Sequence, residues 1–165
     1  MHDGRVDAPA AIAIRPATPA DAEPAIAVVR RSIVALCGPD HQGDPQTLEA
    51  WLANKTPARF PEWIADPDNT TRVGTLHGLV AGVGMLHATG ELRLFYVAPG
   101  AQRRGIGRAL HAALAAEARR AQLPALHLCS TSVARPFYEA LGYVPSGPRR
   151  RWHGMLWCHP YRLPL

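Results

Sequence analysis

The sequence predicts a mixed α/β fold in which helices cover a largely antiparallel sheet. Three observations predict it. Between residues 70 and 98, alternating apolar residues are interrupted twice by a pair that ends in glycine, as in strands joined by hairpins. In three other segments, apolar residues recur at spacings of three and four, as on one face of a helix. The short segment 124–129 is mostly apolar and is typical of a buried strand.

The first half of the chain is expected to contain one strand and two helices. Residues 11–15, AIAIR, form the strand. Each helix start is marked by a capping residue followed by proline, at Thr18-Pro19 and at Asp44-Pro45. The apolar stripe of the first helix runs to Leu36, and a short structured piece follows around Trp63.

The second half of the chain supplies most of the sheet. We expect three strands at 70–77, 79–88 and 91–98, a helix that ends near Ala121, and the buried strand 124–129. Ser130 or Ser132 is expected to cap a last helix that ends at Leu141, and residues 143–165 to hold two more short strands. The predicted order is therefore β-α-α-β-β-β-α-β-α-β-β.

Length and composition set the class of protein. The chain has 165 residues, of which 47% are apolar, which is enough for one hydrophobic core. We expect residues 1–10 to be a flexible tail and residues 11–165 a single domain. The start has acids and a proline in place of the apolar run of a signal peptide, and no apolar run approaches the roughly 18 residues of a membrane span. We therefore expect a cytoplasmic protein with no membrane partner.

The basic residues indicate an anionic partner. The formal net charge is +5, and 17 of the 18 basic residues are arginine, Lys55 being the exception. The arginines are dispersed, and no zinc finger, basic heptad region or aromatic RNA-binding motif accompanies them. This pattern favours an anionic small molecule over nucleic acid.

The cysteines and histidines do not predict a metal site. Cys37, Cys129 and Cys158 are odd in number and widely spaced, so we expect reduced thiols that are mostly buried, rather than a disulfide framework. Cys158 and His159 are adjacent but have no partner in a known motif, and no HExxH, HxH or CxxC pattern is present. Cys129 as a nucleophile is a weaker alternative, because no neighbouring motif supplies its base.

Residues 92–108, LRLFYVAPGAQRRGIGR, carry the strongest functional signal. An extended strand is followed by a Pro-Gly break and by a glycine-rich, arginine-rich start of a helix. Main-chain N–H groups and arginines that converge at a helix N-terminus suit a pyrophosphate. The loop is not a P-loop, because Arg108 and Ala109 follow Gly107 where lysine and a hydroxyl residue would be needed. Leu110 takes the place of the third glycine of a dinucleotide-binding fingerprint.

The remaining pattern, Q-x-x-G-x-G after V-A-P, resembles the acetyl-coenzyme A loop of the GNAT N-acetyltransferase superfamily. The segment 130–143, STSVARPFYEALGY, is similar to that family's closing strand and helix, and the resemblance covers about residues 11–145. It implies a central mixed sheet, mostly antiparallel, that splays open, with a β-bulge near Phe95–Val97. It also implies acetyl-coenzyme A as cosubstrate, without a metal.

The resemblance assigns cofactor-binding residues to one strand, the glycine loop and the turn before the last helix. Thr131 stands where many family members have asparagine, which weakens the assignment at that position. The expected cofactor-binding residues are Phe95, Tyr96, Val97, Gln102, Arg103, Arg104, Gly105, Ile106, Gly107, Arg108, Thr131, Ser132 and Ala134.

Two catalytic residues are expected from the resemblance. Tyr138 matches the family's general acid; helical geometry places its hydroxyl at the edge of a core face formed by Val133, Phe137 and Leu141. Glu91 lies 11 residues before Gln102, as does the glutamate base of histone-directed members. The alternatives to Glu91 are a simple ion pair with Arg93, a water chain, or His87 or Glu62 as base.

The function implied is transfer of an acetyl group to a primary amine of a small molecule or peptide, by direct attack in a ternary complex. Acceptor choice is expected to lie with the first two helices and the C-terminal strands. These carry His41, Trp51, Arg59, Trp63, Trp152, His153 and Trp157. The alternatives are a catalytically silent acyl-coenzyme A-binding module and a nucleic-acid binder, and both a monomer and a homodimer stay open.

Overall fold

The computed structural model describes residues 11–152 and 156–165. The expected tail at 1–10 and His153 lie outside the described residues. Within the described part, the predicted elements are present in the predicted order, with two further short helices and one further strand.

The first sheet is antiparallel and has the order β1-β2-β3-β4. Its strands are β1 (Ile12–Pro16), β2 (Asn69–Leu76), β3 (Leu79–His87) and β4 (Leu92–Val97). The β2–β3 connection is a two-residue turn in which His77 and Gly78 both have positive φ, 50° and 81°. That conformation matches the twist of a tight hairpin, so the predicted meander is confirmed.

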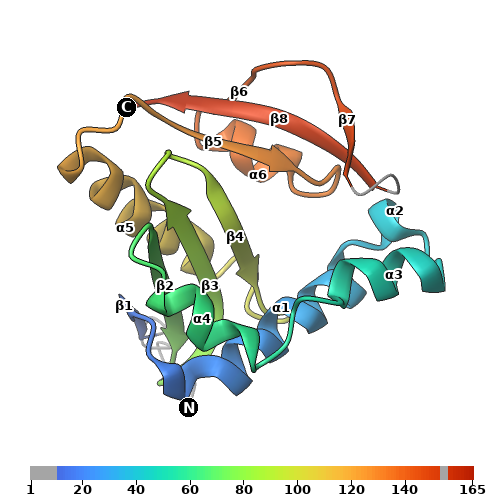
Figure 1. Ribbon diagram of the computed structural model, residues 1–165, viewed down its shortest axis with the longest axis horizontal. Coiled ribbons are helices and arrows are strands. Elements are labelled where there is room, and N and C mark those ends of the chain that lie inside the picture. Colours follow the sequence, from blue (N-terminus) through green and yellow to red (C-terminus); the bar gives the residue numbers. More distant parts are fainter. Residues whose placement is uncertain (1–10, 153–155) are drawn as a thin grey trace, which may run out of the picture.

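The second sheet has the order β5-β8-β6, and β7 also pairs with β8. Its strands are β5 (Ala125–Ser130), β6 (Val144–Pro145), β7 (Arg150–Trp152) and β8 (Leu156–Pro164). The last strand has nine residues and is longer than expected. The two sheets meet at a parallel bridge between Glu91 and His127 and diverge beyond it, so the expected splay between β4 and β5 is present (Figure 1).

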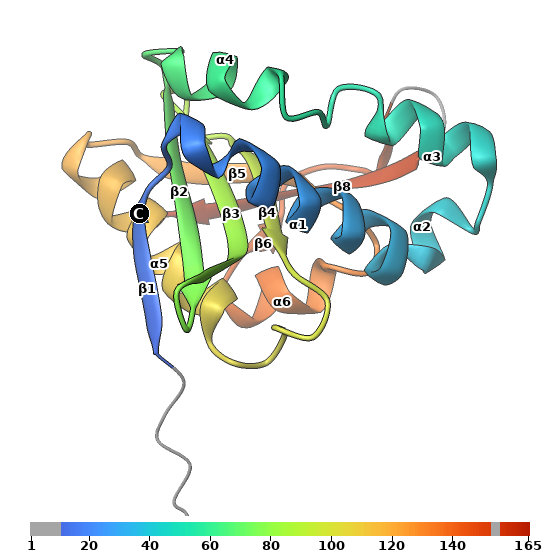
Figure 2. The ribbon, with the colours of Figure 1, turned by 90° about the horizontal axis from the view of Figure 1, so that it is seen from below.

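Helices cover both faces of the first sheet. The 3-10 turn η1 (Pro19–Asp21), α1 (Ala22–Leu36), α2 (Gly38–His41), α3 (Pro45–Leu52) and α4 (Arg59–Ala65) follow one another in the chain. The other helices are α5 (Ile106–Arg120) and α6 (Arg135–Ala140). In Figure 2, α1 lies in front of the strands of this sheet and α5 lies behind them. The approach of α5 to β3 is close, because a Cβ atom at Gly84 would lie 2.7 Å from Leu114.

The helix starts follow local chemistry. Thr18 and Asp21 form a capping box, and the Asp44 side chain accepts a hydrogen bond from the Thr47 amide at 2.9 Å, so both predicted starts are confirmed. The predicted serine cap of α6 is wrong. The Thr131 hydroxyl instead accepts from the Ala134 amide at 3.3 Å, one residue before the helix.

The expectation of reduced thiols is wrong for two of the three cysteines. Cys129 and Cys158 form a disulfide, with 5.3 Å between their Cα atoms. Their separation of 29 residues gives no sequence signal, and it is the antiparallel pairing of β5 with β8 that brings them together. Cys37 is the free cysteine; it is buried, and burial raises the pKa of its thiol to about 12.

No helix among residues 11–152 and 156–165 is long and apolar enough to cross a membrane.

Candidate active site

The open edge of β4 carries main-chain donors that face the gap between the sheets. The Ala98 amide donates to the Ala81 carbonyl at 2.8 Å, which closes the ladder with β3. Because amides of an antiparallel strand alternate between its two edges, the N–H groups of Phe95 and Val97 point away from β3. They therefore point toward the divergent end of β5.

The β-bulge of β4 lies earlier than expected. Met85 pairs with Leu94 and Leu86 pairs with Leu92, so Arg93 is the extra residue, and the expected bulge near Phe95–Val97 is wrong. The bulge has a structural consequence. It brings the side chains of Leu92 and Phe95 to the same face, where both pack in the core with α5.

The glycine loop presents a row of main-chain donors at the start of α5. Within the described chain, the N–H groups of residues 102–108 donate no hydrogen bond. Gly105, with φ of 92°, is the N-cap of this 15-residue helix, and Arg103 has φ of 59°. Unpaired N–H groups and the helix dipole make this position favourable for an anion. The side chains of Gln102, Arg103, Arg104 and Arg108 are exposed around it.

At Gly107, the start of α5 packs closely against α6 and β4. A Cβ atom there would lie 3.1 Å from the Phe137 ring and 3.7 Å from Val97, which is tight packing. Ile106, by contrast, is buried in the core and holds the first turn of α5 in place. The glycine loop thus combines unpaired N–H groups with one buried side chain, Ile106, that packs in the core.

Tyr138 is more deeply buried than the sequence suggested. Only 6% of it is exposed, whereas Val133, which was expected to face the core, is 41% exposed; α6 starts after Val133, so the expected four-residue stripe does not include it. The Tyr138 ring packs against Phe95, Phe137 and Tyr143 at centroid distances of 5.3–6.2 Å. Burial raises the pKa of Tyr138, and the nearby Tyr143 and Tyr96 raise it further. The phenol is therefore protonated at neutral pH.

His111 belongs to the same cluster and was missed by the sequence analysis. Its Nε2 atom lies 2.9 Å from the Tyr143 hydroxyl, and its ring contacts Phe95 and Tyr143. Burial, with a smaller effect from Arg119, lowers the pKa of His111 to about 4, so the imidazole is neutral. The helical stripe of α5 could have found it, since His111 follows Leu110 on the buried face.

Glu91 lies at the end of the gap where β4 and β5 still touch. Its carboxylate accepts a hydrogen bond from Arg93 Nε at 3.2 Å, and 43% of its side chain is exposed. The ion pair that the sequence left open as an alternative is therefore formed. Tyr96 faces the other side of β4, where it packs among residues of α1 and α3, and burial raises its pKa.

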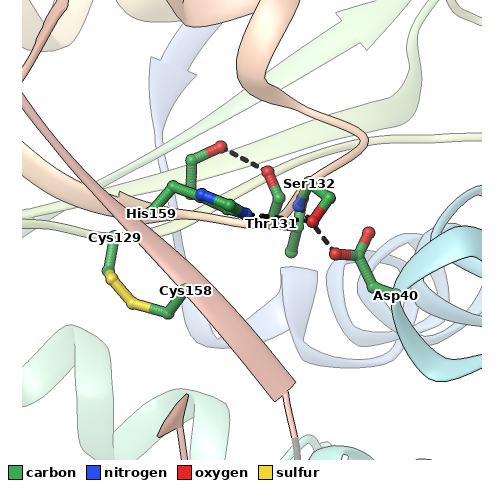
Figure 3. The surroundings of a disulfide bond; sticks show 7 residues. Asp40, Cys129, Thr131, Ser132, Cys158 and His159 are labelled. Atoms are coloured by element: carbon green, nitrogen blue, oxygen red, sulfur yellow. Dashed lines mark hydrogen bonds between the residues drawn. A yellow bond between two sulfur atoms is a disulfide. The ribbon is translucent and has the colours of Figure 1, made fainter. Parts of the chain in front are cut away.

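The turn before α6 is tied to two distant elements (Figure 3). The Ser132 amide donates to Asp40 of α2 at 2.6 Å, and the Ser132 hydroxyl lies 3.0 Å from Nε2 of His159 on β8. His159 thus contributes to holding this turn in place. The Thr131 hydroxyl and the Ala134 amide are bonded to each other at 3.3 Å, so the polar groups of this turn are engaged within the protein, as are those of Ser132.

A cavity of about 610 Å³ opens beside Glu91. Its lining comes from the start of β4, from β5, from β7 and β8, and from the segment before β7. The lining residues are Glu91, His127, Leu128, Cys129, Ser146, Gly147, Pro148, Arg150, Pro160 and Tyr161.

Comparison with known proteins decides the family. A model of the GNAT acetyltransferase domain matches residues 39–165. The chain belongs to the GNAT acetyltransferase family. The resemblance inferred from the glycine loop is thus confirmed, and the chain is an acyltransferase by family.

Solved structures of GNAT proteins share the fold. A GCN5-related N-acetyltransferase from Rhodopseudomonas palustris is 26% identical, with a TM-score of 0.82, over 93% of this chain and 95% of that one. The PaiA N-acetyltransferase from Thermoplasma acidophilum, solved with coenzyme A, is 17% identical, with a TM-score of 0.81, over 94% and 99%. The ribosomal-protein-S18-alanine N-acetyltransferase from Escherichia coli is 21% identical, with a TM-score of 0.65, over 93% and 94%. A search of curated proteins found no match.

Proposed function

We propose that this GNAT protein is an acetyl-coenzyme A-dependent N-acetyltransferase that acts on a primary amine in a ternary complex. The observation that carries the proposal is the row of unpaired N–H groups at residues 102–108, beside the open edge of β4. Coenzyme A in the complex of the Thermoplasma acidophilum PaiA N-acetyltransferase supports the same cofactor here.

The glycine loop would hold the diphosphate of the cofactor. Its main-chain donors and the positive end of the α5 dipole favour two negative charges, and Arg103, Arg104 and Arg108 add charge around them. Residues 102–108 have the donors that this group needs, so the fit is good. The residues assigned by resemblance, from Gln102 to Arg108, lie together at this one point.

The open edge of β4 and the phenol of Tyr138 would serve the acyl end. A main-chain N–H at Phe95 or Val97 is placed to stabilise the negative charge that develops on the carbonyl oxygen during attack. Tyr138 would donate its proton, or a strong hydrogen bond, to the departing thiolate. The raised pKa of Tyr138 keeps that donor protonated.

Glu91 would help to deprotonate the attacking amine. A lysine-like amine has a pKa near 10.4, so only about one in 10³ is neutral at pH 7. A carboxylate that accepts the proton, directly or through water, removes part of this cost. The exposed Glu91–Arg93 pair is weak, because surface ion pairs contribute about 0–1 kcal/mol, and it can open when substrate arrives.

The proposal is tested by cofactor binding and by coenzyme A release. Acetyl-coenzyme A at 100 times its Kd should add about 2.7 kcal/mol to the free energy of unfolding, and an amine panel should show thiol release above the rate without acceptor. Stabilisation without turnover on any amine would favour the silent module, and absence of stabilisation would contradict the proposal.

A further inference from the structure

The cavity beside Glu91 has one guanidinium and one carboxylate among its lining residues, and a second arginine lies on the same face of the sheet. Arg150 lines the cavity, and Glu91 is the single carboxylate among the lining residues. Arg162 pairs with His127 across β5 and β8, so its side chain lies on the same face as that histidine.

The negative charge of Glu91 does not balance these arginines. Glu91 is already paired with Arg93 at 3.2 Å. Within the described part of the chain, neither Arg149 nor Arg150 lies within ion-pair distance of a carboxylate. The guanidinium of Arg149 is stacked on Trp157, 3.9 Å from the ring centroid, on the face of β8 opposite to Cys158 and Arg150, so Arg150 is the arginine that faces the cavity.

The floor of the cavity is held rigid. Cys129 lines it and is bonded to Cys158 (Figure 3). Cys158 in turn pairs with Arg150 across β7 and β8. The disulfide therefore links β5, the strand beside Glu91, to β8, the strand with which β7 and its Arg150 pair. A rigid floor suits a site that must hold an acceptor at a fixed distance from the reacting groups.

We infer that this cavity takes the acceptor, and that the acceptor is an elongated amine that carries a carboxylate, which Arg150 binds. The guanidinium fork matches a carboxylate with two parallel hydrogen bonds. Glu91 and Arg150 lie on strands three spacings apart, roughly 14 Å across the strands, and are offset by four residues along β8, roughly 13 Å, so the amine and the carboxylate must be several bonds apart. This inference rests on the proposed N-acetyltransferase function.

Matched acceptor pairs test the inference. Diglycine and triglycine are compared with their C-terminal amides at about pH 9, above the α-amino pKa of roughly 8, so that all the amines are largely neutral. Coenzyme A release is measured with saturating acetyl-coenzyme A. We expect kcat/KM to be at least roughly 10-fold higher for each acid than for its amide, as for a lost charge-assisted hydrogen bond.

Arginine variants test whether Arg150 causes the preference for the acid. Arg150→Gln should abolish the preference for the acid, and Arg150→Lys should keep a part of it, because lysine keeps the charge but loses the fork. The control is Arg119→Gln, an exposed arginine in the last turn of α5 that removes the same charge far from the cavity and should keep the full preference.

The outcomes separate the two proposals. If acetyl-coenzyme A stabilises the protein but the amides are used as well as the acids, or no acid is used, the carboxylate inference is overturned and cofactor binding stands. A preference for the acid that survives in Arg150→Gln also overturns it. If acetyl-coenzyme A does not bind at all, the proposed function itself fails.

Discussion

Tyr138 shows how burial shapes the chemistry of one residue. Its ring is enclosed by Phe95, Phe137 and Tyr143, so its phenol is held in one orientation and stays protonated. A phenol with a raised pKa is a weaker acid but a reliable hydrogen-bond donor. We therefore expect it to act on the thiolate late in the reaction and to contribute little to cofactor binding.

Tyr138→Phe should lower kcat by about 10²- to 10⁴-fold, the usual size of a lost general acid, and leave the Kd for coenzyme A nearly unchanged. Stopped-flow thiol release and calorimetric titration measure the two quantities. Tyr143→Phe is the control, because it removes a buried hydroxyl from the same cluster and should reduce stability by about 1 kcal/mol while activity persists. Full activity in Tyr138→Phe would exclude the acid role.

Glu91→Gln should lower kcat/KM most at neutral pH, and the loss should shrink as the pH rises, since the amine then deprotonates without help. The pH–rate profile of the variant measures this. Glu62→Gln is the matched control: Glu62 is also exposed and paired with an arginine, Arg59, at 3.0 Å. An unchanged profile in Glu91→Gln would exclude Glu91 from proton transfer, and an effect confined to Glu62→Gln would point to Glu62.

At the scale of elements, β5 and β8 depend on a covalent link as well as on their ladder. The Cys129–Cys158 bond closes a loop of about 29 residues, which includes α6 and the turn bound by Asp40. In the chain-entropy account, such a loop contributes about 3–4 kcal/mol to the free energy of unfolding.

Cys158→Ser should therefore lower the free energy of unfolding by about 3–4 kcal/mol in buffer without reductant, and the difference from the parent protein should nearly vanish with reductant. Denaturant titration measures this. Cys37→Ser is the control, since it leaves the disulfide intact. Thiol titration of the denatured, unreduced parent protein should give one thiol per chain; three thiols would show that the bond does not form.

Elements with local signals could be predicted from the sequence, and contacts between distant elements could not. The hairpins, the helix starts at Thr18 and Asp44 and the glycine loop each depend on a few neighbouring residues. The disulfide, the Asp40–Ser132 contact and the His111–Tyr143 hydrogen bond depend on how strands and helices meet, which no local pattern states. The bulge lies at Arg93, at least two residues before the predicted position. The sequence could not place it, because the register of β4 is set by its partner strand.

At the scale of the whole molecule, the two sheets meet at one bridge. At the other end of the gap, α2 is hydrogen-bonded to the turn that follows β5. The bridge at Glu91 and His127 fixes the closed end of the gap, and Asp40 of α2 holds the turn at its open end. The aromatic cluster around Phe95 and Tyr138 fills the space between β4, α5 and α6. The stability of this cluster therefore bears on the whole fold.

Acid should destabilise the protein through His111. Its pKa in the folded protein, about 4, lies below the ordinary 6.5, so the unfolded chain binds the proton more readily. Stability is full above pH 6.5 and falls as the pH drops toward 4, by about 2 kcal/mol at pH 5. Asp21, whose pKa is lowered to about 2 by Arg15, acts mainly below this window.

Urea unfolding at pH 7.5 and pH 5 measures this loss. In His111→Asn the difference between the two pH values should be smaller by about 2 kcal/mol, and in His77→Asn, a variant in the exposed β2–β3 turn, it should match the parent protein. An equal pH dependence in all three proteins would show that His111 is not held neutral by burial.

The central claim is that the main-chain donors of residues 102–108 grip the cofactor beside the open edge of β4. Hydrogen–deuterium exchange with and without coenzyme A tests it most directly, because it reports on those N–H groups themselves. The account predicts slower exchange at residues 102–108 and at Phe95 and Val97, with little change in α3 and α4. Tight binding of coenzyme A that leaves exchange at 102–108 unchanged would contradict the account.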